Sequence, residues 1–138
     1  MGIIRLNNMS FYGYHGVYDF EKEQGTNFEV DLELFTSLAT SSKSDKIEDT
    51  INYEDVYELV KKSFGSKSYF LLEKLADSIS KSIFNEHNIE KLIIRVRKIN
   101  APLDGKLDSV EIEKLCFNNF SPFTLSGHGC NRCQALFR

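Results

Sequence analysis

The sequence predicts an α+β fold with the element order β-β-α-α-β-β, in which two helices cover one face of a four-stranded antiparallel sheet. Two strand-like segments precede two segments with a helical repeat, and two more strand-like segments follow them. Each pair of consecutive strands is joined by a loop, which favours antiparallel pairing. The chain has 138 residues, of which 41% are hydrophobic, and this suffices for one domain with a single core.

The first predicted strand covers residues 3–14. Its apolar positions change parity at Asn7-Asn8. A β-bulge at the two asparagines would account for this change, because a bulge inserts one extra residue into a strand. Residues 15–25 form the next loop, and we expect it to contain one helical turn at residues 18–23.

The second predicted strand shows the clearest pattern, in which apolar and acidic residues alternate as in a strand with one face in water. The alternating residues are Phe28, Glu29, Val30, Asp31, Leu32, Glu33 and Leu34. This strand is long and regular and has no proline, so we expect it to be an exposed edge that invites pairing with another chain. The sheets of neighbouring subunits would then join edge to edge and could close into a barrel. The polar, serine-rich residues 37–46 are predicted to be a connection.

Two helices are predicted from apolar residues at three- and four-residue spacing. The first repeat contains Tyr53, Val56, Tyr57, Val60 and Phe64, and the second contains Leu72, Leu75, Ala76, Ile79 and Ile83. Asn52 is the predicted N-cap of the first helix, and Gly65-Ser66 ends it. Ser68 is the predicted cap of the second helix. The third and fourth strands are predicted at residues 92–98 and 110–117.

The composition excludes several classes of partner. The net charge is −3 and the pI is about 5.6, without the basic face of a nucleic-acid binder. The longest apolar stretch is far shorter than the ~20 residues of a membrane-spanning helix. The N-terminus lacks the pattern of a signal peptide, and three cysteines do not complete a disulfide framework. We therefore expect a soluble cytoplasmic protein without a nucleic-acid or membrane partner.

Lys98 is a charged residue in an apolar position. It continues the face of the third strand that carries Ile94 and Val96, whereas Arg95 and Arg97 point to the other face. A partly desolvated lysine has a lowered pKa and can exchange protons near neutral pH. Alternatively, Lys98 has reached the end of the strand and turns into water.

Glu73 is a second charge beside an apolar stripe, within the run Leu71-Leu72-Glu73-Lys74-Leu75-Ala76. It falls in the first turns of its helix, where the helix dipole favours an anion. One interpretation is a boundary glutamate that pairs with neighbouring side chains. The other is a carboxylate that accepts hydrogen bonds from a ligand with two adjacent N–H groups.

Two further segments could contribute to a site. The first, residues 11–16, combines aromatic residues with glycines and is followed by Glu21, which could be a pocket group or an ordinary loop charge. The second, residues 49–53, leads into the first helix, where backbone N–H groups are free. Its Tyr53 could be a phenolic acid or a half-buried packing residue.

In this order, the motifs together resemble dihydroneopterin aldolase of folate biosynthesis. The resemblance runs from about residue 3 to residue 117. The matching motifs are Phe11-Tyr12-Gly13-Tyr14-His15-Gly16, Glu21 four residues before Gly25, Thr50-Ile51-Asn52-Tyr53, Leu72-Glu73-Lys74-Leu75-Ala76, and Lys98 four residues before Pro102. The chain departs from the family in having Asn52 where a histidine is common, Ala101-Pro102 in place of Pro-Pro, and Ile99 where an acidic residue is frequent.

The resemblance implies the tunnelling fold, in which four sheets join into a barrel, two barrels stack into an octamer, and pockets lie between subunits. Glu73 would bind the pterin ring with help from the backbone of Leu72, and Tyr53 would reach in from a neighbouring subunit. Glu21 would contact the substrate side chain or orient Lys98, the general acid and base. Three further residues complete the implied substrate-binding set: Val17, Ile51 and Asn52.

The implied reaction is a retro-aldol cleavage of 7,8-dihydroneopterin that needs no cofactor and no metal, because the pterin ring accepts the electrons. The sequence also has no paired histidine metal motif. One alternative is an epimerase that inverts the 2′-carbon of dihydroneopterin or its triphosphate. The triphosphate version is disfavoured, because Arg95 and Arg97 point away from Lys98. A second alternative is a non-catalytic pterin-binding protein.

The sequence divides into an aldolase domain at residues 1–117 and a C-terminal extension at residues 118–138. The extension contains Cys130 and Cys133 in a C-x-x-C spacing, close to His128. Together with Cys116 they could bind zinc, but a structural zinc site normally needs four well-spaced ligands. We therefore expect a surface extension rather than a metal site.

Overall fold

The structure is a computed structural model that describes residues 1–118. Its elements are β1 (Gly2–Gly13), α1 (Asp19–Gln24), β2 (Thr26–Thr36), α2 (Ala39–Ser44), the 3-10 turn η1 (Ile47–Asp49), α3 (Tyr53–Ser66), α4 (Leu72–Glu86), β3 (Lys91–Lys98) and β4 (Val110–Phe117). The predicted order β-β-α-α-β-β is confirmed, and the helical turn predicted at residues 18–23 is present as α1. The short helix α2 and the turn η1 after β2 were not predicted. The cysteines and histidine considered for zinc at positions 128–133 lie outside the described residues.

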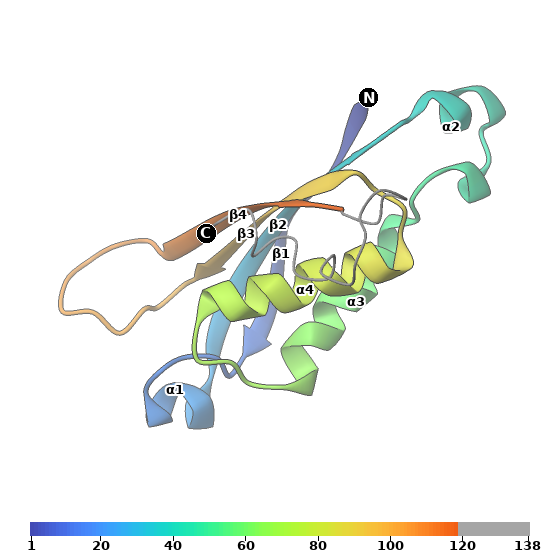
Figure 1. The fold of residues 1–138 in the computed structure, drawn as a ribbon. Coiled ribbons are helices and arrows are strands. Elements are labelled where there is room, and N and C mark those ends of the chain that lie inside the picture. The colour runs from blue at the N-terminus through green and yellow to red at the C-terminus, as the bar shows by residue number, and fades with distance from the viewer. Residues whose placement is uncertain (119–138) are drawn as a thin grey trace.

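The sheet has the strand order β1-β2-β3-β4, and every neighbouring pair is antiparallel (Figure 1). The prediction that β2 is an exposed edge is wrong, because β2 lies between β1 and β3. The acidic face of β2 explains the error: its carboxylates meet arginines of β3 within the sheet instead of facing water alone. Among the described strands, β1 and β4 are the edges.

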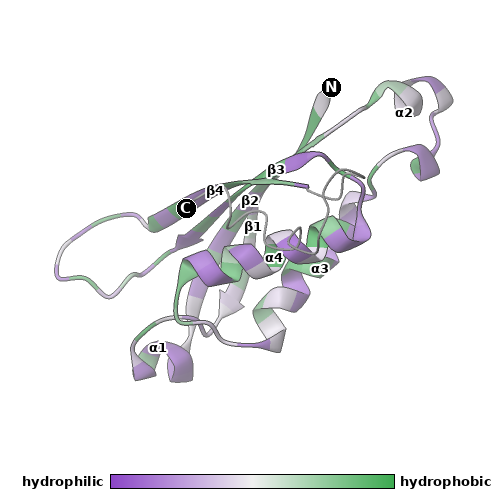
Figure 2. Ribbon diagram, in the orientation of Figure 1, coloured by the Kyte–Doolittle hydropathy of each residue, from purple (hydrophilic) through white to green (hydrophobic). Residues whose placement is uncertain are grey.

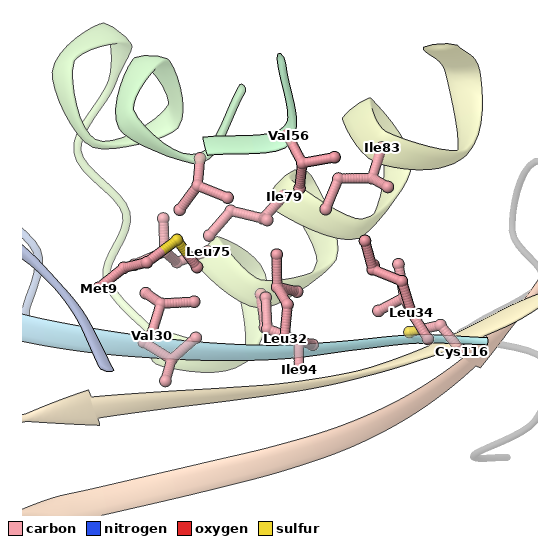
Figure 3. Packing of buried hydrophobic residues seen from close by; sticks show 14 of the residues in the cluster. Met9, Val30, Leu32, Leu34, Val56, Leu75, Ile79, Ile83, Ile94 and Cys116 are labelled. Carbon is pink, nitrogen blue, oxygen red and sulfur yellow. The ribbon is translucent and has the colours of Figure 1, made fainter. Parts of the chain in front are cut away.

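The two long helices, α3 and α4, lie across one face of the sheet and enclose the core (Figure 3). Inward-facing residues of the strands, such as Val30, Leu32 and Ile94, are completely buried against Val56 and Ile79 of the helices. Both helices carry hydrophobic and hydrophilic positions along their length (Figure 2). This burial of one stripe on each helix supplies the main stabilisation of the fold.

The predicted β-bulge is present in β1. The pairing register between β1 and β2 shifts between Leu6 and Met9, so one extra residue is inserted at the asparagines. Asn8 adopts a left-handed backbone conformation with φ of 59°, which asparagine tolerates better than most residues. Its N–H donates a hydrogen bond to Asp31 at 2.6 Å, and its side-chain oxygen accepts one from Arg97 at 3.0 Å.

The helix caps were predicted with mixed success. The side chain of Asn52 accepts a hydrogen bond from the N–H of Glu54 at 3.0 Å and caps α3, as predicted. The prediction that Ser68 caps α4 is wrong, because the N-cap position is Leu71, which has no capping side chain. The helix cannot begin earlier because both backbone groups of Tyr69 bind the loop after β1.

The segment predicted as a plain connection contains the short helix α2. Its serines fold back onto the chain, since the hydroxyls of Ser41 and Ser42 both donate to the carbonyl of Leu38. Composition alone cannot distinguish such local hydrogen bonding from a loop. Within the described part of the chain, no helix is long and apolar enough to cross a membrane.

Candidate active site

Lys98 and Glu21 form an ion pair at one end of the sheet. The lysine is the last residue of β3, and the glutamate lies in α1. The Nζ atom of Lys98 lies 2.8 Å from Oε2 of Glu21, and the two side chains are only 12% and 7% exposed. The alternative that Lys98 turns into water at the strand end is therefore wrong.

The carboxyl group of Glu21 is held in its charged form. Burial raises its pKa, but the hydrogen bond and charge of Lys98 and the backbone N–H groups of Tyr18 and Val17 together lower it more. The pKa of Glu21 is therefore lower than that of an ordinary glutamate. Glu21 consequently faces Lys98 as a carboxylate near neutral pH.

The loop after β1 allows Glu21 to take this position. Gly16 lies so close that a Cβ atom at this residue would collide with the carboxyl group of Glu21. The neighbouring N–H of Tyr18 donates to the other oxygen of Glu21 at 3.3 Å. The glycine noted in the sequence is thus required for close approach of the acidic side chain.

A pocket of about 230 Å³ surrounds the ion pair. It is formed by α1 and the loop before it, by the first residue of α4, and by the β3–β4 connection, parts of which lie at the same end of the sheet (Figure 1). The lining residues are Val17, Tyr18, Glu21, Leu72, Lys98, Ala101, Pro102, Leu103 and Val110. Most of the wall is apolar, which strengthens electrostatic interactions inside it.

The structure brings together four of the predicted site residues: Lys98, Glu21, Val17 and Leu72. It also adds Tyr18 and Leu103, which were not among the residues predicted from the sequence. Tyr18 follows Val17 directly, so the signal for it was its position next to a predicted wall residue. No comparable signal pointed to Leu103, because the β3–β4 connection has no regular pattern.

Glu73 lies next to this pocket but does not line it. It is exposed in the first turn of α4, directly after Leu72. The interpretation that Glu73 pairs with a neighbouring charge finds no support among the described residues, where it has no ion pair within 4 Å.

The remaining predicted residues lie elsewhere in the chain. Tyr53 is 62% exposed and is therefore not a half-buried packing residue. It lines a second hollow of about 520 Å³ beside the bulge of β1. Ile51 is buried in the hydrophobic core, and the side chain of Asn52 is engaged in capping α3. A single chain thus does not bring Tyr53 to Lys98.

His15 is buried beneath the site. Its ring stacks on Tyr69 and meets Phe28 and Phe64 edge-on. Burial, and then the nearby charge of Lys98, lower its pKa from 6.5 to about 4, so the imidazole is neutral at physiological pH. Across residues 1–118, no three His, Cys, Asp or Glu side chains are grouped so that they could hold a metal ion.

Comparisons with known proteins identify the family of the chain. The family model described as "Dihydroneopterin aldolase" matches residues 4–114. A dihydroneopterin aldolase of Staphylococcus epidermidis is 41% identical over 112 residues, covering 80% of this chain and 93% of its own length. One of Streptococcus pyogenes serotype M18 is 38% identical over 114 residues, covering 82% of this chain and 96% of its own.

A solved structure shares the fold. The dihydroneopterin aldolase of Escherichia coli, determined in complex with neopterin, superimposes with a TM-score of 0.74 at 24% identity, covering 83% of this chain and 99% of its own. The predicted tunnelling-fold unit is therefore confirmed. The sequence match extends over most of the chain and includes the segments that form the pocket. The chain belongs to the dihydroneopterin aldolase family.

Proposed function

We propose that the chain cleaves 7,8-dihydroneopterin into 6-hydroxymethyl-7,8-dihydropterin and glycolaldehyde. The observation that carries this proposal is the Lys98–Glu21 ion pair in an apolar pocket of a chain from this family. A neighbour of the same fold holds neopterin, which has the same ring system and side chain apart from ring oxidation.

The proposed reaction is a retro-aldol step. The hydroxyl group on the second side-chain carbon loses its proton, and the bond between the first and second carbons breaks to release glycolaldehyde. The electron pair passes into the ring imine, where N5 takes up a proton and the first carbon becomes part of an enol. Protonation of the first carbon and loss of the N5 proton then restore the imine and give the hydroxymethyl product. The ring itself stores the electrons, so we propose that no metal and no Schiff base takes part.

Lys98 is the proposed general acid and base for these proton transfers, acting through water. Glu21 accepts a hydrogen bond from its ammonium group and fixes the position of Nζ at the pocket wall. This arrangement keeps a proton donor beside the place where charge develops, against a mostly apolar wall. Tyr53 is the proposed second donor, which protonates the enol.

Glu73 and Leu72 are the proposed contacts for the pterin ring. They lie in the first turn of α4, whose N-cap Leu71 offers no side chain to the free backbone N–H groups. The carboxylate of Glu73 can accept two hydrogen bonds from the 2-amino group and N3–H of the ring. Val17, Ile51 and Asn52 are the remaining proposed substrate-binding residues.

We propose that the complete site is shared between subunits of a homo-tetramer or homo-octamer. The pocket of one chain, at about 230 Å³, is smaller than the roughly 300–1,000 Å³ of usual ligand sites. Several apolar residues around it, such as Val17 and Leu103, are exposed in the single chain, and so is Tyr53. Burial of these residues against a neighbour would supply the missing wall and the tyrosine.

A mixing experiment tests the shared site. Lys98→Ala and Tyr53→Ala chains should each be inactive as homo-oligomers. The two variants are mixed in equal amounts, unfolded together and refolded. If the chains assemble at random into the closed oligomer, about a quarter of the interfaces contain both wild-type Lys98 and wild-type Tyr53. About a quarter of the wild-type activity should therefore return. Failure to recover activity, with mixed oligomers present, would place Tyr53 and Lys98 of the same chain in one site.

The reaction itself is tested by incubating the protein with 7,8-dihydroneopterin and separating the products. Hydroxymethyldihydropterin with glycolaldehyde is the expected outcome. The 2′-epimer alone would assign the chain to the epimerase reaction, and an unchanged but bound pterin would indicate a binding protein. A triphosphate substrate is disfavoured because Arg95 and Arg97 bind carboxylates on the opposite face of the sheet.

We further propose that residues 1–117 form the catalytic domain, with residues 118–138 as an extension, and that the enzyme acts in the cytoplasm. The family match ends at residue 114, close to the end of β4.

A further inference from the structure

Two hydrogen bonds connect the loop after β1 to the segment before α4. The backbone N–H of Tyr69 donates to Nδ1 of His15 at 3.0 Å, and the N–H of Gly16 donates to the carbonyl of Tyr69 at 3.0 Å. We call these two bonds the 15–69 bridge. One of the two acceptors is a side chain, so the bridge depends on the identity of residue 15.

On one side, the 15–69 bridge contacts the Lys98–Glu21 ion pair through Gly16. Gly16 touches the carboxyl group of Glu21, with no space for a side chain between them. Glu21 in turn holds the ammonium group of Lys98 at 2.8 Å. A movement of residues 15–16 would therefore displace the Lys98–Glu21 pair.

The other end is attached to α4. The hydroxyl group of Tyr69 donates to the side chain of Ser78 on that helix at 3.1 Å, and α4 begins only three residues after Tyr69, at Leu72. The bridge consequently connects two parts of the proposed site that come from distant parts of the sequence. These are the proton-transfer pair and the start of the helix that carries Glu73.

The surroundings of His15 keep its imidazole neutral, so that Nδ1 remains a hydrogen-bond acceptor. The side chain is 1% exposed and packs among the rings of Phe28, Phe64 and Tyr69. The ammonium group of Lys98 is close enough to oppose protonation, and the imidazole stays neutral well below pH 7. Because Nδ1 accepts from Tyr69, the proton of the neutral ring resides on Nε2.

We propose that His15 is a positioning residue that fixes the start of α4 relative to the Lys98–Glu21 pair. This inference rests on the proposed function, in which the pterin ring is bound at α4 and its side chain reacts at Lys98. Loss of the acceptor leaves α4 and Glu73 intact, so the ring still binds. The reacting carbons are then no longer held at the right distance from Lys98, and misplacement of this kind reduces turnover.

A matched pair of variants tests the acceptor. Asparagine and leucine branch alike, but only asparagine presents an oxygen at the place of Nδ1. His15→Asn should retain kcat within about threefold, whereas His15→Leu should lose about 10- to 100-fold in kcat. The Kd for neopterin should change by less than about threefold in both variants, since contacts to the ring are kept.

Controls separate positioning from folding. His15→Phe keeps the aromatic packing without the acceptor and should behave like His15→Leu, which covers the case in which the leucine variant does not fold. His87→Phe, at the opposite end of α4, should leave kcat unchanged. All rates are referred to the folded fraction measured by circular dichroism.

Two outcomes would overturn the inference. Equal kcat for the leucine, phenylalanine and wild-type chains would show that His15 does not position the site. Equal losses in the asparagine and leucine variants, in proportion to their folded fraction, would show a purely structural role. A wild-type chain that leaves dihydroneopterin uncleaved would instead overturn the proposed function, and the role of His15 in turnover with it.

Discussion

Lys98 and Glu21 are 77 residues apart in the sequence, yet their charged groups lie 2.8 Å apart. The lysine is fixed by the register of β3 against β2, where it is opposite Phe28. The glutamate is fixed by a short helix inserted into the β1–β2 loop. The sheet and the loop therefore each deliver one member of the pair, and substitutions in either element should affect the same step.

Replacement of Lys98 by alanine should abolish turnover and leave pterin binding largely intact. The ammonium group is the proposed proton donor, and such a group contributes about 10²- to 10⁴-fold to rate. Product formation and the Kd for neopterin measure the two effects. Lys62→Ala, on the exposed surface of α3, is the control. A Lys98→Ala chain with normal turnover would show that another group transfers the protons.

Replacement of Glu73 by alanine should mainly destroy binding. A carboxylate that accepts two hydrogen bonds from the ring contributes on the order of 2–4 kcal/mol, so the Kd should rise by about two orders of magnitude. Titration with neopterin measures the change. Glu86→Ala, in the last turn of the same helix, should bind like the wild type. Unchanged affinity in the Glu73 variant would assign ring recognition to other residues.

Gly16→Ala should displace Glu21 and reduce both stability and turnover. The added methyl group collides with the carboxyl group of Glu21, and overpacking of this kind costs about 1–3 kcal/mol in the free energy of unfolding. Gly65→Ala is the matched control, because a Cβ at that position of α3 meets nothing within 4 Å. It should stabilise the helix by about 0.5–1 kcal/mol. Urea unfolding of both variants decides the comparison.

Stability should fall as the pH is lowered from 6.5 towards 4, in part because of His15. Its pKa is about 4 in the folded chain and 6.5 as the ordinary value, so the unfolded chain binds the extra proton within this window. The contribution lost is at most about 3 kcal/mol. Urea unfolding at several pH values should show a shallower decline for His15→Asn. Parallel declines would mean that other groups cause the dependence.

Arg97→Leu should destabilise the sheet without changing the pocket. The guanidinium group binds Glu29, Asp31 and Glu111, and it holds the pKa of Asp31 below its ordinary value. Its removal leaves carboxylates facing one another, at a cost of about 2–4 kcal/mol. Thermal unfolding measures the loss. Arg5→Leu, whose only ion pair in residues 1–118 is at 3.7 Å to Glu33, should cost much less.

The sequence was sufficient to predict those parts of the fold that depend on local periodicity. Alternation placed Lys98 on the helix-covered face of β3 and Arg97 on the other, and the parity change in β1 indicated the bulge at Asn8. The start of α4 could not be predicted in this way, because it is set by the contact between Tyr69 and His15, 54 residues away. Ser68 is a residue type that often caps helices, but the long-range contact of Tyr69 with His15 prevents the helix from beginning there.

From local patterns the site was predictable only as a set of separate residues, and the pairing of Glu21 with Lys98 followed from the family resemblance alone. Lys98 was identified from its position on β3. Its partner Glu21 lies in a short helix of the β1–β2 loop, and the path of that loop depends on Gly16 and on the segment around Tyr69. The exposed placement of Tyr53 and Glu73 was likewise not visible in their helical spacing. Both follow from which side of α3 and α4 the sheet covers, and this is decided by tertiary packing.

The bulge at Asn8 also determines the shape of a free edge. Deletion of Asn8 would make the pairing of Leu6 with Leu32 and Met9 with Val30 continuous, so the inward face of β1 does not require the extra residue. The residue adds local twist, together with its hydrogen bonds to Asp31 and Arg97. β1 is an outer strand of the described sheet, so one side of its backbone is unpaired. Because a bulge bends its strand, a further strand could pair with this side only if it had the same curvature. Backbone shape therefore limits which chains can be added to this edge.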